Sequence, residues 1–390
     1  MRGHSVSQIT KPQSCRLITE RNEMPQIVYI DITTTATETP SNLQQMGAIV
    51  SLGGTMLTTG TFQAITSTAD FTAIASSTAA SGVVNTAVTN FYQQGSGTVY
   101  ILELGADATY SVALDAFISG NPQTFYAYHL PGEPVDTDAN LVNMCKNYVS
   151  QNSMTYFFFD CTLAQVAQFN GTKSVFASTN YSGAASTETS SVHAFYEFIN
   201  ASPTSAKKLA PFAFRYMYGL TSWPERGNQT AFANMKSAYL NFIGTGAQGG
   251  VSDDLLFWGY FQDGKPASYW YAVDWVQIHL ARDLAYEIIT GSNSTVNPLV
   301  YNQQGITRLQ ARAATTLDTG VSYGCIVGAP VVSAVDFGTY VTENPGDYAT
   351  GTYNGLSATI TPMRGFEQIT FYLNVDFSGT AAVTTTTTGS

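Results

Sequence analysis

The stretch Met154-Thr155-Tyr156-Phe157-Phe158-Phe159-Asp160 decides the fold of this 390-residue chain. Its four consecutive aromatic residues leave no polar face, so a strand formed here must be covered on both sides, as the strands of parallel sheets are. Strand patterns flank it at Thr124–His129 and Ser174–Ala177, with helical patterns between them. Strands that alternate with helices are typical of βαβ units. The middle of the chain, about 95–205, therefore predicts an α/β fold with a mixed, largely parallel sheet and flanking helices.

Further elements of both kinds lie on either side of this region. Ser67 begins a helix-start signal ahead of Phe71, because a serine there accepts a backbone N–H of the first turn. Asp263-Gly264 predicts a tight turn before the longest helix. The other predicted strands are Gly47–Leu52, Val99–Leu104 and Leu255–Phe261, and the predicted helices are Val84–Gln94, Tyr110–Ile118, Asp138–Gln151, Leu163–Phe169, Thr187–Asn200, Ser268–Thr290 and Gln303–Leu317.

The composition shows a folded chain with few charges. Only 11% of its residues are charged, whereas soluble domains average about 25%, and its 13% of aromatic residues excludes disorder for most of the chain. The net charge of −11 argues against a direct nucleic-acid role, because phosphate contacts need clustered cations. A surface poor in charge suits contact with other protein, since interface centres are depleted in charge. The alternative is a polar surface of Thr and Ser.

The two ends of the chain differ from the body between them, residues 36–365. Residues 1–24 hold four basic residues and predict a flexible extension, and residues 25–35 predict an arm strand. At the other end, 366–390, the pattern Phe366–Phe377 is the longest strand signal and precedes a disordered tail. These two strands could pair with each other or with the sheet edge of a neighbouring molecule. The predicted inter-subunit arm residues are Ile27, Tyr29, Ile30, Ile32, Ile369, Phe371, Leu373 and Val375.

The sequence shows no constellation of residues for catalysis or metal binding. The histidines stand in unrelated contexts (His4, His129, His193, His279), and no GxSxG motif accompanies them. The pair Asp253-Asp254 could bind a cation, but such pairs in polar loops are more often solvated. Gly244, Gly246 and Gly249 have GxGxxG spacing but lead into a predicted strand, which favours a flexible loop over a phosphate site. We therefore expect no catalytic residue, cofactor or metal, and no enzyme.

Cysteine usage and hydropathy bear on the compartment. The four scattered cysteines predict free, mostly buried thiols in a reducing compartment: Cys15, Cys145, Cys161 and Cys325. No secretory signal and no stretch of 18 apolar residues is visible, so we expect no membrane insertion.

Two surface or core features each allow two interpretations. Trp270, Tyr271 and Trp275 make an aromatic helix that either packs on the sheet or stacks on a ligand, and the core interpretation is the commoner one. Arg308 and Arg312 lie four residues apart and so share one helix face. That face is either simply solvated or contacts an acidic partner.

Several motifs together resemble the contractile tail sheath proteins of myovirus-type phages. In the C-terminal region, about 250–365, they are Gly259–Lys265, the aromatic helix Trp270–Leu280, Asn297–Tyr301 with Gly305-Ile306 in place of that family's proline-tyrosine turn, Tyr301–Leu309 and Gly324-Cys325-Ile326. In the N-terminal half they are Ser67–Phe71 and Asn90–Gln94. The proline here is displaced from the tyrosine. The resemblance covers about two-thirds of the chain.

This resemblance implies a structural subunit that polymerises around a tail tube and contracts to drive the tube through a bacterial envelope. It implies N- and C-terminal arms that add strands to neighbouring subunits. The implied partners are further copies of the chain, the tail tube protein, and the baseplate and tail terminator proteins. The implied location is the virion tail, assembled in the host cytoplasm, and Arg308 and Arg312 become candidates for contact with the tube.

Two other functions stay open at the level of sequence. One is a different tail component, such as a tube, baseplate or receptor-binding protein, although the βαβ pattern does not suit an all-β receptor binder. The other is an enzyme with a doubly wound domain, for which the fold by itself is no argument.

Overall fold

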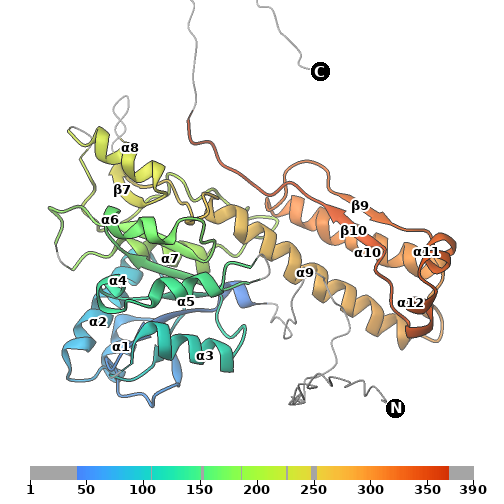
Figure 1. Ribbon diagram of the computed structural model, residues 1–390, viewed down its shortest axis with the longest axis horizontal. Coiled ribbons are helices and arrows are strands. Elements are labelled where there is room, and N and C mark those ends of the chain that lie inside the picture. Colours follow the sequence, from blue (N-terminus) through green and yellow to red (C-terminus); the bar gives the residue numbers. More distant parts are fainter. Residues whose placement is uncertain are drawn as a thin grey trace, which may run out of the picture.

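A computed structural model describes residues 42–106, 108–150, 153–185, 187–224, 227–246 and 253–368. Figure 1 shows a sheet covered by helices, from which one long helix, α9 (Ala267–Ser292), projects to one side. We call the sheet and the helices that cover it, together with α9 up to residue 278, the sheet body. We call residues 279–359, which continue along and beside the projecting part of α9, the lobe.

The sheet is mixed and largely parallel, as the sequence predicts. Its eight strands lie in the order β2-β3-β1-β4-β5-β6-β7-β8. Only the outermost pairs, β2 with β3 and β7 with β8, are antiparallel. The strands are β1 (Gly47–Ser51), β2 (Phe62–Ile65), β3 (Val99–Glu103), β4 (Ala127–His129), β5 (Tyr156–Asp160), β6 (Val175–Thr179), β7 (Asn241–Thr245) and β8 (Asp254–Phe257).

The aromatic run of β5 supplies both layers of the core. Phe158 faces one layer, and its neighbours Phe157 and Phe159 face the other, because successive side chains of a strand point to opposite faces. All three are fully buried. In the first layer, the ring of Phe158 lies 4.9 Å from that of Phe176 on β6 and 5.2 Å from that of Phe198. The apolar run is therefore explained by a sheet with helices on both faces.

Different helices cover the two faces. The first face is covered by α1 (Thr68–Ile74), α2 (Ala79–Gln94), α7 (Ser190–Ile199) and the first half of α9. The second is covered by a π-turn (Tyr110–Leu114), α3 (Asp115–Gly120), α5 (Leu141–Asn147), α6 (Leu163–Val166), a 3-10 turn (Ala167–Phe169) and α8 (Gln229–Ser237). Two short elements remain in the sheet body, the 3-10 turn Leu43–Gln45 and α4 (Pro134–Thr137).

The lobe is a helical hairpin with a small sheet on one side. Its remaining elements are α10 (Gln303–Ser322), β9 (Val331–Ala334), α11 (Phe337–Glu343), α12 (Pro345–Thr350) and β10 (Leu356–Thr359). α10 packs antiparallel to α9, and β9 and β10 form a two-stranded antiparallel sheet beside α10. Figure 1 places α11 and α12 at the far end of the lobe. From there β10 leads the chain back toward the sheet body.

Several sequence predictions are confirmed. Ser67 caps α1 and accepts the backbone N–H of Asp70 at 3.3 Å. The turn at Asp263-Gly264 forms, with Gly264 at a φ of 77° and its N–H bonded to the carbonyl of Phe261 at 2.9 Å. The two long helices form as well, and both extend a few residues beyond their predicted ends.

Other predictions are wrong. The strand predicted over Leu255–Phe261 ends at Phe257, because the chain turns at Gly259, whose φ of 77° excludes continued extended structure. The helix predicted over Asp138–Gln151 is shorter, spanning Leu141–Asn147. Gly244, predicted as loop, lies inside β7, and Gly246 follows that strand directly. The sequence also gave no signal for β2, α8, β9, β10, α11 and α12.

The predicted arm strands fall largely outside the described residues. Ile27, Tyr29, Ile30 and Ile32 precede residue 42, and Ile369, Phe371, Leu373 and Val375 follow residue 368. The described start of the second pattern, Phe366 to Gln368, has no strand assignment. Within the described ranges, no helix has the length and apolar character needed to cross a bilayer.

Candidate functional site

The carboxyl edge of the parallel strands is where open α/β sheets bind ligands, and here a buried carboxylate occupies it. Asp160, the last residue of β5, accepts the backbone N–H of Ser191 at 2.9 Å, the hydroxyl of Ser190 at 3.1 Å and the amide of Asn180 at 3.2 Å. Burial raises the pKa of Asp160 to about 6, against the effect of these donors. Its contacts place the carboxylate at the start of α7, where the helix dipole favours negative charge. Asp160 therefore caps a helix.

A histidine and a serine meet beside it. His129 Nε2 lies 3.0 Å from Ser191 Oγ, which is the first half of a nucleophilic constellation. The second half is missing, because His129 Nδ1 has no partner among the described residues. Burial, and then the charge of His193, lower the pKa of His129 to about 3. Both side chains are fully buried, so a substrate has no access to them. The pair supports the structural interpretation of this histidine.

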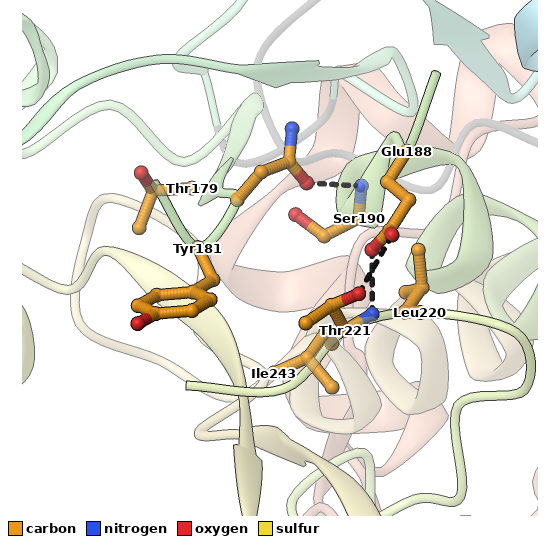
Figure 2. A pocket seen from close by; sticks show the side chains of 8 residues that line it. Thr179, Tyr181, Glu188, Ser190, Leu220, Thr221 and Ile243 are labelled. Carbon is orange, nitrogen blue, oxygen red and sulfur yellow. Dashed lines mark hydrogen bonds between the residues drawn. The ribbon is translucent and has the colours of Figure 1, made fainter. Parts of the chain in front are cut away.

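The hollow next to this edge is closed by hydrogen bonds between loops (Figure 2). Glu188 accepts the backbone N–H of Thr221 at 2.5 Å and its hydroxyl at 2.7 Å. These contacts hold the loop before α7 against the segment that follows Leu220. The hollow leaves no room for a water molecule, and its lining residues are Thr179, Asn180, Tyr181, Glu188, Ser190, Leu220, Thr221 and Ile243.

The other candidates for chemistry have structural surroundings. Asp254 opens β8 and accepts the hydroxyl of Ser222 at 2.6 Å. Within the described part of the chain, no group of three or more histidines, cysteines, aspartates or glutamates could hold a metal ion. Cys145, Cys161 and Cys325 are free and buried, as predicted, and burial raises the pKa of the Cys325 thiol to about 12. Cys15 lies outside the described residues.

The aromatic helix packs on the sheet. Trp270, Tyr271 and Trp275 belong to the first core layer, with exposed fractions of 4% or less. Trp270 donates its indole N–H to Asp263 at 2.8 Å. The core interpretation of this cluster is confirmed.

Arg308 and Arg312 do share one face of α10, and each is paired inside the lobe. Arg308 forms an ion pair with Glu287 on α9 and donates to the carbonyl of Asn297 at 2.9 Å. Arg312 lies 3.4 Å from Asp283, also on α9. Both guanidinium groups therefore stabilise the packing of α10 on α9. Contact with an acidic partner remains a prediction. The partly exposed guanidinium groups of these two residues would make that contact.

The lobe exposes more large apolar side chains than its size would lead one to expect. Eight of the 18 large apolar side chains that are exposed in the described residues lie in it, although it holds only about a quarter of those residues. They are Tyr286, Ile289, Val296, Val300, Val327, Val331, Val335 and Tyr348. Scattered exposed apolar residues are normal, and this enrichment makes the lobe the candidate interaction surface of the described residues.

The small sheet of the lobe adds an open edge. The outer edge of β9 is partly closed by α10, because Gln310 donates to the carbonyl of Val332 at 3.0 Å. β10 pairs only with β9 within the described ranges. A strand edge of this kind presents free N–H and C=O groups to another chain.

The described ends of the chain are both fixed near the start of α9. At the N-terminal side, Gln44 donates to the carbonyl of Tyr271 at 2.9 Å. At the C-terminal side, the N–H of Met363 bonds to the carbonyl of Cys325 at 3.0 Å, and a hydrogen bond joins Tyr260 to Glu367. The described part of the chain therefore begins and ends close to the junction of the sheet body with the lobe.

Comparison with known proteins bears on the fold. No model of a protein family and no curated protein matches the sequence. Among the solved structures that match are three that cover at least 90% of this chain, each 14% identical. A chain of the anti-feeding prophage baseplate has a TM-score of 0.64 and covers 91% of this chain and 100% of its own. The sheath complex of PVC, an extracellular contractile injection system, in the contracted state has a TM-score of 0.58 with 92% and 99% covered. The contracted helical sheath of the anti-feeding prophage has a TM-score of 0.56 with 90% and 98% covered. The chain has the fold found in the sheaths of contractile injection systems.

Proposed function

We propose that this chain is the structural subunit of a contractile tail sheath, which polymerises around a tail tube and contracts to drive the tube through a bacterial envelope. The observation that carries the proposal is the match of 92% and 90% of the chain to two sheath structures of contractile injection systems. The described surface is compatible with this role, because the lobe exposes apolar side chains and a free strand edge. A phage particle and its host cytoplasm, as the place of assembly, are part of the same proposal.

Subunits would be linked by strand addition. In this account Ile27–Ile32 and Phe366–Phe377 of neighbouring copies extend the small sheet of the lobe, one of them pairing with the open edge of β10. Backbone hydrogen bonds of this kind keep subunits connected while the sheet bodies change their packing. The proposed division of the chain follows from it: an extension at 1–24, an arm at 25–35, a body at 36–365 and a second arm at 366–390.

The proposal includes partners other than the chain itself. These are the tail tube protein, with Arg308 and Arg312 as the contact, and the baseplate and tail terminator proteins. A baseplate chain is among the matching structures, which supports association with a baseplate and also keeps a second candidate function, a baseplate component of such a particle. A role without catalysis agrees with the buried surroundings of His129 and Asp160.

Deleting the residues after Gly365 tests the arm. The expected product is a folded monomer that does not polymerise, because it keeps both core layers and loses one arm strand. Sedimentation velocity measures the polymer, and circular dichroism checks the fold. A matched control replaces residues 366–390 with a Gly/Ser segment of equal length. Normal polymerisation of either variant would contradict strand exchange.

Reversing the charges of Arg308 and Arg312 to glutamate tests the tube contact. We expect sheaths that no longer assemble on purified tubes. The lobe's ion pairs also break, so Glu287→Lys and Asp283→Lys are added to restore them with the opposite polarity. If the fourfold variant coats tubes as the wild type does, the contact lies elsewhere.

A further inference from the structure

A buried carboxylate joins the sheet body to the lobe helix. Asp274, on α9, is completely buried, and its Oδ2 accepts the hydroxyl of Tyr126 at 2.8 Å and that of Tyr156 at 2.6 Å. Tyr126 directly precedes β4, and Tyr156 begins β5. The carboxylate therefore fastens α9 to the amino ends of the two central strands. Its other oxygen, Oδ1, has no hydrogen-bond partner among the described residues, so the two tyrosines carry this attachment.

A buried cation stands on the same side of the sheet. Lys173 lies two residues before β6 and has 3% of its surface exposed. Its Nζ lies 4.3 Å from the ring centroid of Trp270, on the first turn of α9, and 5.8 Å from that of Tyr156. Burial lowers the pKa of Lys173, and the charges of Asp274 and Asp263 oppose that effect. The lysine thus adds a charge contact between β6 and the start of the lobe helix.

The N-terminal segment reaches the same place. Gln44 donates from Nε2 to the carbonyl of Tyr271 at 2.9 Å, and the hydroxyl of Tyr126 lies 3.4 Å from the same nitrogen. Its neighbour Leu43 is fully buried. The chain that leads in from residues 1–41 is therefore anchored on groups that also hold α9.

These hydrogen bonds constrain the orientation of α9 on the sheet more directly than the surrounding aromatic packing does. Apolar burial is non-directional, whereas hydrogen bonds need defined distances and angles. Two hydroxyl groups on one carboxylate oxygen therefore fix both the rotation and the position of α9 on the sheet. A helix of 26 residues is about 39 Å long, so a rotation of about 10° at its start moves its far end by about 7 Å. The direction of the lobe depends strongly on this attachment.

We propose that these residues act as a joint that sets the direction of the lobe relative to the sheet body. The joint cluster consists of Gln44, Tyr126, Tyr156, Lys173, Trp270 and Asp274. The direction of the lobe is a property of the single subunit, whereas its use in a sheath rests on the proposed function.

Spin labels measure the direction of the lobe within one subunit, in full-length protein kept dispersed before assembly. The pair Glu133→Cys and Glu343→Cys places one label on the sheet body and one at the far end of the lobe, on exposed residues. Cys15→Ser removes the one cysteine not shown to be buried. Pulsed electron–electron double resonance then gives the distance distribution between the two labels. The joint cluster as we describe it gives one narrow distribution in the otherwise unaltered chain.

Two kinds of variant break the joint. Asp274→Asn removes the buried charge, and the pair Tyr126→Phe with Tyr156→Phe removes both donors and keeps the shape. We expect either change to widen or split the distance distribution in protein that is folded by circular dichroism. Tyr126→Phe alone is the milder variant, for use where the others do not fold, and should give an intermediate width.

A hydrogen bond between a tyrosine and an aspartate inside the sheet body supplies the matched control. Tyr148 donates to Asp115 at 2.7 Å, away from α9, so Tyr148→Phe should leave the distribution unchanged. An unchanged distribution in the folded joint variants would overturn the proposal. So would equal widening in Tyr148→Phe, which would show a general loosening of the sheet body. The measurement needs no polymer, so it stands even where the chain forms no sheath.

Discussion

The sheet body and the lobe differ in how they bury their side chains, and α9 runs through both. From Ala267 to Ile278 the helix is largely buried against the sheet, whereas between Ile278 and its end only Gly291 is buried. The largest fully buried side chains of the described residues all lie in the sheet body. The comparison shows that the sheet body buries its large side chains within one molecule, whereas the lobe leaves more of its apolar side chains exposed.

The largest expected effect comes from the core of the sheet body. Phe158→Ala removes a ring that is fully buried and packed against Phe176 and Phe198. We expect the free energy of unfolding to fall by about 3–5 kcal/mol, because the surrounding side chains relax only partly and leave a cavity. Chemical denaturation of the truncated monomer measures it. A loss below about 1 kcal/mol would show that the core is not closely packed.

The next effect is a dependence of stability on pH, again in the sheet body. The pKa of Asp160 is about 6 in the folded chain and about 3.9 in an unfolded one. The folded state thus binds the proton more tightly, so this group lowers the free energy of unfolding as pH rises from about 4 to about 6, by up to about 3 kcal/mol.

Asp160→Asn removes this titration and keeps the size and an acceptor oxygen. We expect the difference in unfolding free energy between variant and wild type to shift in favour of the variant as pH rises through that interval. Denaturation at pH 4, 5, 6 and 7 measures it. A difference that is constant with pH would show that Asp160 titrates normally.

The smallest effect on the monomer is expected in the lobe. Val331, on β9, is 59% exposed, and exposed substitutions usually change stability by about 0.5 kcal/mol or less. Val331→Glu should therefore leave the monomer as stable as before and weaken the polymer, because it places a charge on a surface proposed to meet other copies. Thermal unfolding and sedimentation measure the two quantities. A destabilised monomer that still forms normal polymers would show that Val331 stabilises the single molecule and does not contact other copies.

Sequence reasoning predicted the sheet body well because its patterns are strong. The run Tyr156–Phe159 and the strands beside it specify a covered parallel sheet, and Ser67 marks the start of α1 through its cap. In the lobe, β9 and β10 are only four residues long and largely exposed, and Ser357, Ala358 and Thr359 of β10 are all exposed. A strand that is half-covered in one molecule gives a weak signal.

The joint cluster was missed for a different reason. Asp274 stands inside an apolar helix pattern, and its partners Tyr126 and Tyr156 lie more than one hundred residues away in the sequence. Only the parallel order of β4 and β5 brings the two hydroxyl groups together. A lone aspartate on the buried face of an aromatic helix was the available signal. Ion pairing of Arg308 and Arg312 was likewise invisible, because it depends on how α10 lies on α9.

Electron microscopy of the purified full-length chain tests the central claim most directly. A sheath subunit should form hollow tubes with regular helical striations, whose reconstruction shows each lobe in contact with arms of neighbouring copies. The chain lacking the residues after Gly365 should show none under the same conditions. Dispersed full-length particles under conditions that support assembly, or tubes in which no lobe meets another copy, would contradict the account.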